Sequence, residues 1–172
     1  MTALTRSPQN TNLAQVTKHT LVFQRIPTVQ YFCQSVNIPG VSVSGISRST
    51  PFTDLWYPST KMEYNQFDIT FLVDEGLTTW KTLQDWFRAV ASPKSFDEKN
   101  TLLQLQGGSK FSDATVTLLS ALNNSIAQVY FHNLFPLSLG DLTFDTTQSA
   151  DNILTSTATF RYDYYDLLPV TS

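Results

Sequence analysis

The chain has 172 residues, enough for one domain with its own hydrophobic core. A net charge of −3, with no run of Lys or Arg, argues against a surface that grips nucleic acid. Charged residues make up only 15% of the chain, against roughly 25% in soluble domains, while aromatic residues reach 13%. Because interfaces are poor in Lys, Glu and Asp, this composition indicates much surface hidden by neighbours. An all-β domain rich in Thr and Tyr would show the same composition.

The single cysteine, Cys33, excludes an internal disulfide. Its apolar and aromatic neighbours indicate a buried structural thiol rather than a nucleophile. No stretch approaches the roughly 20 apolar residues of a membrane span. Residues 1–16 lack the apolar segment of a signal peptide. We therefore expect a protein that is made in a reducing cytoplasm and does not bind membranes.

The N-terminal part of the chain changes character near residue 18. Residues 1–17 are polar and aperiodic, and we predict a flexible arm followed by a single domain over residues 18–172. Three strands are predicted first, separated by Pro27 and by an Ile-Pro-Gly turn. They cover residues 20–26, 29–37 and 41–47.

Residues 48–61 are predicted as a loop, because they hold two prolines and little charge. They also carry three aromatic residues, Phe52, Trp56 and Tyr57. Exposed aromatic side chains in a loop usually pack on something. Packing on the chain's own domain and docking onto a neighbouring molecule both fit this pattern.

After a predicted strand over residues 62–73, one helix is expected over residues 79–91, with Thr78 or Thr79 as its N-cap and Pro93 as its stop. One apolar stripe follows the helical period and indicates core packing. It consists of Trp80, Leu83, Phe87 and Val90, flanked by Trp86. Residues 92–112 are predicted as a long surface loop with a short ordered piece near Leu102–Leu105.

Strands are predicted again over residues 113–121, 126–134, 137–145 and 153–165. Asn123-Asn124 forms a hairpin turn, Pro136 breaks a strand, and Gly140 marks a bulge or bend. The last strand alternates strictly, so polar side chains share one face and apolar or small ones share the other. The polar row is Thr155, Thr157, Thr159, Arg161 and Asp163; the other row is Leu154, Ser156, Ala158, Phe160, Tyr162 and Tyr164. The polar row predicts either an ordinary solvated face or a weakly charged channel wall.

Taken together, the elements predict a mainly β protein, an antiparallel sandwich or small barrel with one flanking helix. No catalytic constellation stands out. The two histidines, His19 and His132, lie in separate predicted strands, and one cysteine adds too little for a zinc site. Asp74 and Glu75 fit the positive end of a helix better than acid–base chemistry. We expect no enzyme activity, no metal and no cofactor.

Three stretches, residues 67–93, 116–145 and 155–168, together resemble the tail tube family of contractile-tail bacteriophages. That family includes the hexameric tube protein of type VI secretion. With the early strands, the resemblance covers residues 18–168. It implies a tail-tube-like β-barrel or sandwich with one helix, in hexameric rings whose sheets join into an inner barrel. Stacked rings would form the tube, the conduit for DNA ejection.

The resemblance also implies a structural virion protein of the phage tail, assembled in the host cytoplasm. Its partners would be copies of itself, tail sheath and baseplate proteins, and DNA that passes without specific binding. A baseplate-proximal initiator or adaptor ring, and a secreted hexameric tube protein of a type VI-like injection system, are the alternatives. A chain with room for one domain favours the repeated tube subunit. A small β-barrel binding module or enzyme is the remaining hypothesis.

By the same resemblance, the segment of residues 46–62 would reach the adjacent ring, and the polar row of residues 153–165 would line the lumen. The predicted ring-stacking residues are Ile46, Arg48, Phe52, Asp54, Leu55, Trp56 and Tyr57. The predicted lumen-facing residues are Thr155, Thr157, Thr159, Arg161 and Asp163.

Overall fold

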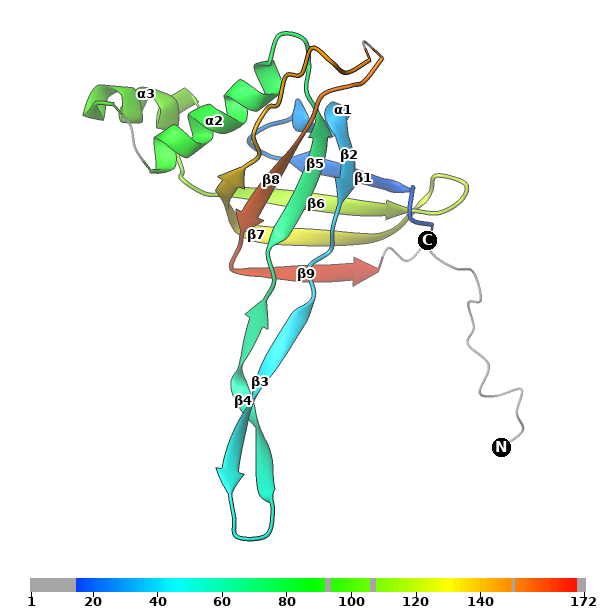
Figure 1. The fold of residues 1–172 in the computed structure, drawn as a ribbon, viewed down its shortest axis with the longest axis vertical. Helices are drawn as coiled ribbons and strands as arrows, with labels where there is room; N and C mark the ends of the chain where they lie inside the picture. The colour runs from blue at the N-terminus through cyan, green and yellow to red at the C-terminus, as the bar shows by residue number, and fades with distance from the viewer. Residues whose placement is uncertain (1–14, 92–93, 106–107, 150, 170–172) are drawn as a thin grey trace.

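The computed structural model describes residues 15–91, 94–105, 108–149 and 151–169 (Figure 1). Most of the predicted N-terminal arm, and the predicted helix stop at Pro93, lie outside these ranges. The strands are β1 (His19–Phe23), β2 (Cys33–Val36), β3 (Val41–Ser49), β4 (Asp54–Tyr64), β5 (Phe67–Leu72), β6 (Ser112–Leu119), β7 (Ser125–Leu139), β8 (Thr155–Arg161) and β9 (Tyr164–Pro169). The helices are α1 (Val29–Phe32), α2 (Thr78–Val90) and α3 (Phe96–Leu105).

The strands of the described residues form two antiparallel sheets. Seven strands make the body, in the order β1-β6-β7-β8-β5-β2, with β9 also paired to β7. The remaining two, β3 and β4, pair only with each other. In Figure 1, β1, β6, β7 and β9 cross the body while β2, β5 and β8 run steeply, so the large sheet folds over itself. The mainly β, antiparallel architecture of the prediction is confirmed.

Strand β7 belongs to both halves of the folded sheet. Its first part pairs with β9 up to His132 and with β6 up to Leu134, and its second part, from Phe135, pairs with β8. Between them Asn133 adopts a φ of 54°, the left-handed region that Asn tolerates. The buried positions shift by one residue there, from Val129 and Phe131 to Leu134 and Pro136. This bulge turns the strand from one layer into the other.

Aromatic side chains fill the space between the two layers and α2. Phe67, Phe131 and Phe160 are fully buried, and the rings of Phe67 and Phe131 lie 4.4 Å apart. Trp86 of α2 packs on Phe160 with ring centroids 5.8 Å apart. Burial of each such side chain contributes about 1.5–3 kcal/mol, so this cluster dominates the stability of the body.

Helix α2 forms as predicted, but its cap and buried face differ from the prediction. The carboxylate of Asp74 accepts hydrogen bonds from the backbone N–H groups of Thr78 and Thr79, so the threonines receive the cap rather than supply it. The residues that α2 buries are Thr79, Leu83, Trp86 and Ala89. Trp86, expected only to flank the stripe, lies at its centre, where it packs on Phe160 and its indole N–H donates to the carbonyl of Lys110.

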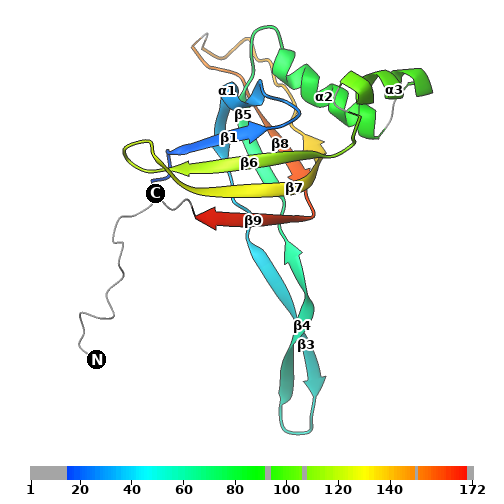
Figure 2. The same ribbon diagram turned by 180° about the vertical axis from the view of Figure 1, so that it is seen from behind.

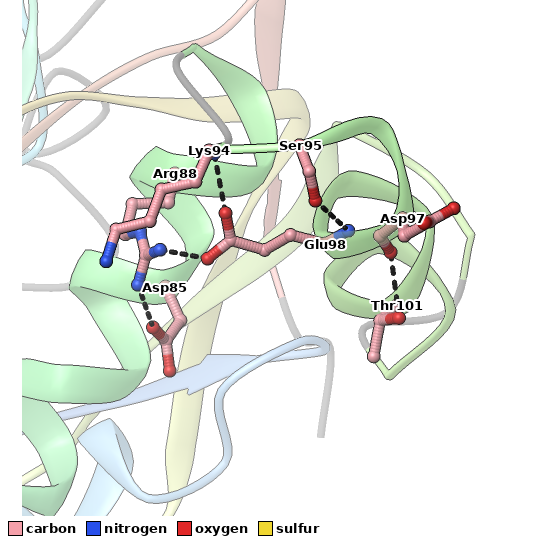
Figure 3. A network of polar contacts seen from close by, with 7 residues as sticks. All are labelled: Asp85, Arg88, Lys94, Ser95, Asp97, Glu98 and Thr101. Carbon is pink, nitrogen blue, oxygen red and sulfur yellow. Dashed lines mark hydrogen bonds and ion pairs between the residues drawn. The ribbon is translucent and has the colours of Figure 1, made fainter.

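A second helix, α3, occupies about half of the loop predicted over residues 92–112. Its first turn is stabilised locally: Ser95 Oγ accepts from the N–H of Glu98, and Glu98 accepts from the N–H of Lys94 and from Arg88 of α2 (Figure 3). These contacts tie α3 to α2. The sequence pattern does not predict this helix, because the apolar residues between 96 and 105 follow the helical period only weakly.

Three strand predictions and one loop prediction also need correction. The predicted strand over residues 29–37 begins with the short helix α1. The predicted loop over residues 48–61 is mostly strand. Strand β7 continues through Pro136, where the register with β8 is irregular, so the missing N–H is tolerated. The predicted strand over residues 153–165 is split at Tyr162-Asp163, because Asp163 turns toward β7 through its N–H bond to His132 O.

Candidate assembly surfaces

The hairpin formed by β3 and β4 extends far from the body, as Figures 1 and 2 show from opposite sides. Every residue of β3 is exposed, and in β4 only Ser59 and Tyr64 are partly covered. Large apolar side chains are nevertheless frequent in it. They are Val41, Val43, Ile46, Phe52, Leu55, Trp56, Tyr57 and Met62. A hairpin so apolar and so little covered is a surface suited to binding another molecule.

All seven predicted ring-stacking residues lie in the outer part of this hairpin, and none is buried. Directly paired residues of an antiparallel ladder point to the same face. The pairs Ile46–Tyr57 and Arg48–Leu55 therefore occupy one face. Trp56, paired with Ser47, occupies the other face together with Asp54. The hairpin thus presents apolar side chains on both faces.

The hairpin tip is closed by hydrogen bonds between Thr50 and Thr53. The N–H of Thr50 donates to Thr53 O at 3.1 Å, and the N–H of Thr53 donates to Thr50 Oγ1 at 3.2 Å. Phe52 stands at the turn with 98% of its surface exposed. Midway along the hairpin a register shift places Gly45 opposite Pro58, and Trp56 lies against Gly45. This bulge accommodates Pro58 within the strand pair. The segment predicted as a loop therefore forms part of a hairpin.

The polar row predicted on the last strand occupies one face of β8. Thr155, Thr157 and Arg161 are exposed and Thr159 is half-buried, while Ser156, Ala158 and Phe160 between them are buried. Neighbouring β5 continues the polar face, with Asp68 opposite Thr159 and Thr70 opposite Thr157. The alternation predicted for residues 155–160 is therefore observed.

The end of that row behaves differently. Asp163 is exposed, but it lies in the turn after β8, where Asn133 Nδ2 donates to its carboxylate at 2.7 Å. Tyr164, predicted on the buried face, is 45% exposed because the chain has already turned into β9. Tyr162 is buried as predicted.

Side chains with catalytic potential are not brought together. In the described ranges, no group of three or more His, Cys, Asp or Glu residues could hold a metal ion. His19 lies in β1 and Cys33 in β2, at opposite ends of the strand order, and His132 pairs with Asp166 at 3.2 Å. Burial raises the pKa of the Cys33 thiol to about 11, which keeps it protonated and unreactive. Among the described helices, none has the length and apolar character needed to cross a membrane.

The described residues thus combine an aromatic β core, a projecting apolar hairpin and a polar sheet face. Residues 5–168 match the phage tail tube protein family, so the chain belongs to that family. It is a structural component of contractile tail systems and not an enzyme, as expected from the sequence.

Individual relatives agree with the family. The tail tube terminator protein of Enterobacteria phage T4 is 27% identical over 141 residues, covering 78% of this chain and 75% of the relative. The tube-terminating cap of the anti-feeding prophage has the same fold, with a TM-score of 0.70 at 13% identity over 99% of this chain and 100% of its own. The sheath–tube complex of an extracellular contractile injection system, PVC, matches with a TM-score of 0.68 at 17% identity, covering 93% and 94% of the two chains.

Proposed function

We propose that the chain forms a homohexameric ring coaxial with the tail tube of a phage-like particle. In this arrangement residues 18–172 act as one ring-forming domain and the β3–β4 hairpin reaches the adjacent ring. The observation that carries the proposal is the hairpin, because its apolar side chains are left uncovered by the chain's own body. Tail sheath and baseplate proteins would be the further partners, because a baseplate and a sheath–tube complex are among the structures that contain this fold.

The ring would stand at an end of the tube as its terminator. This position is favoured by the 27% identity to the T4 tail tube terminator, supported by the fold of the tube-terminating cap. The repeated tube subunit, expected from the sequence because one domain suffices, is the second candidate. It is favoured by the similar match to the sheath–tube complex. A terminator ring also needs only one domain.

In either position the polar face of β8 and β5 would line the channel through which DNA leaves. Six positions of that face carry threonine, one arginine or one aspartate: Thr155, Thr157, Thr159, Arg161, Asp68 and Thr70. DNA affinity grows with the number of phosphates that Lys and Arg neutralise. A wall with one Arg and one Asp would therefore let DNA pass without holding it.

Electron microscopy of the purified protein mixed with tail tubes tests the function and the position together. We expect six-fold rings with a central channel, bound at one end of each tube and preventing further growth there. Incorporation along the tube would show the repeated subunit instead. A protein that stays monomeric at high concentration and leaves tubes unbound would overturn the proposal.

A further inference from the structure

The root of the hairpin rests on three tyrosine rings. Tyr64, the last residue of β4, contacts Tyr162 and Tyr165, with ring centroids 5.8 Å and 5.7 Å apart and edge-to-face angles of 63° and 68°. Tyr162 and Tyr165 are 6.1 Å from each other. We call these three residues the tyrosine cluster. Edge-to-face pairs of this kind each contribute about 0.5–1.5 kcal/mol beyond their buried area, and they fix ring orientation.

The tyrosine cluster is anchored in the core of the body. Phe131, which is fully buried, contacts Tyr162 at 5.0 Å and Tyr165 at 5.6 Å. Tyr162 is only 4% exposed, and its hydroxyl is buried without a hydrogen-bond partner among the described residues. Burial is the main reason that the pKa of Tyr162 rises to about 12, so its hydroxyl stays neutral. Ring packing, rather than hydrogen bonding, therefore holds Tyr162 in place.

The other strand of the hairpin is held by the same cluster. The hydroxyl of Tyr165 donates to the carbonyl of Pro39, just before β3, at 3.1 Å. One residue further on, the N–H of Asn65 donates to Gly40 O, also at 3.1 Å, and closes the root. Tyr165 thus contacts both sides of the root, β4 through the ring of Tyr64 and the segment that leads into β3 through Pro39.

Beyond its root the hairpin receives little lateral support from the described residues. All of β3 is exposed, and a cleft of about 780 Å³ opens beside the root, lined by polar side chains such as Lys61, Glu63 and Arg161. At roughly 3.3 Å per residue, the nine residues of β3 extend about 30 Å, so a rotation of about 10° at the root would displace the tip by about 5 Å. The direction of the hairpin therefore depends on what holds its root.

We propose that the tyrosine cluster is a positioning site that fixes the direction of the hairpin relative to the body before any partner binds. The inference rests on the proposed function, because it assumes that the hairpin is the docking arm. A preset direction lowers the conformational entropy lost on docking. Tyr64, Tyr162 and Tyr165 would accordingly govern assembly without contacting the adjacent ring.

Spin labels at the hairpin and the body test this directly. Labels on Ser49→Cys and Lys81→Cys, in a Cys33→Ser background, report the distance between the outer hairpin and α2 by pulsed electron resonance. Labelled protein is diluted into excess unlabelled protein, so that distances between subunits do not contribute. We expect a narrow distribution for the parent and a broader or shifted one for Tyr64→Ala. Tyr165→Phe, which loses only the bond to Pro39, should show a smaller change in the same direction.

Trp56→Ala is the matched control, since it removes an aromatic ring from the hairpin away from the root and should leave the distribution narrow. Circular dichroism confirms that each variant is folded, and Tyr64→Leu replaces Tyr64→Ala if the latter unfolds. A broad distribution in the parent, or an unchanged one in the folded Tyr64 variant, would overturn the positioning role. Broadening in a protein that forms no rings would support the positioning role and defeat only the proposed function.

Discussion

The body and the hairpin use the same kinds of side chain for opposite purposes. In the body, Phe67, Phe131 and Phe160 are fully buried against one another and α2. In the hairpin, Phe52 and Trp56 are 98% and 69% exposed. Aromatic content alone therefore does not show whether an aromatic side chain is buried and stabilises the fold or is exposed and available to bind a partner. If the proposed function is right, stability and assembly are encoded in separate parts of this chain, and this separation can be tested residue by residue.

The largest expected effect is that of Phe131→Ala. It removes a ring that contacts Phe67, Tyr162 and Tyr165, and truncation of a buried Phe costs about 3–5 kcal/mol of unfolding free energy. Urea denaturation measures this loss. Phe52→Ala, the matched truncation in the hairpin, should change the unfolding free energy by less than about 0.5 kcal/mol. Equal losses in both variants would remove the distinction between body and hairpin.

A smaller loss is expected for Gly140→Ala at the end of β7. An added Cβ would meet Thr157 Oγ1 at 2.8 Å and the Thr157 backbone at 3.1 Å, where Gly140 already bonds to Thr157 O. Such overpacking should cost about 1–3 kcal/mol in the same denaturation assay. Gly40→Ala, where the nearest atom would lie at 3.4 Å, is the control and should be closer to neutral. A neutral Gly140→Ala would mean that β7 and β8 can separate at this end.

The cap of α2 predicts a pH-dependent effect. Hydrogen bonds from the backbone N–H groups of Thr79 and Thr78 lower the pKa of Asp74 to about 2. Because this is below the unfolded value of about 3.9, the carboxylate stabilises the fold above pH 4 and stops doing so as the pH falls toward 2. Asp74→Ala should therefore lower the melting temperature at pH 7, with the difference from the parent shrinking below pH 4. Glu75→Ala leaves both backbone N–H bonds to the Asp74 carboxylate in place, so it is the control and should keep the pH dependence of the parent.

The smallest effect on stability and a large one on assembly are expected for Trp56→Ala and Tyr57→Ala. Both side chains are exposed, on opposite faces of the hairpin. Melting temperatures should stay near that of the parent, while the binding of rings to tubes, counted by electron microscopy, should fall. Unchanged assembly with a large drop in melting temperature would show instead that the hairpin packs on its own body.

The sequence predicts an element correctly where one periodicity governs the whole of that element. The alternation of residues 155–160 and the apolar stripe near Leu83 each follow from one face being buried. The sequence does not predict an element correctly where several local effects combine. Pro58 indicated a loop, but a bulge at Gly45 accommodates it within the hairpin. Pro136 indicated the end of a strand, but β7 continues through it because the pairing with β8 is irregular there. The position of the tyrosine cluster depends on contacts between residues a hundred positions apart, which no local pattern contains.

The proposed ring is tested most directly by cryo-electron microscopy of the protein bound to tail tubes. The account predicts a six-fold ring at the tube end, with the β3–β4 hairpin in contact with the adjacent ring and the Thr155–Arg161 face turned toward the channel. A ring whose hairpins point into solvent, or whose channel is lined by another face, would contradict it.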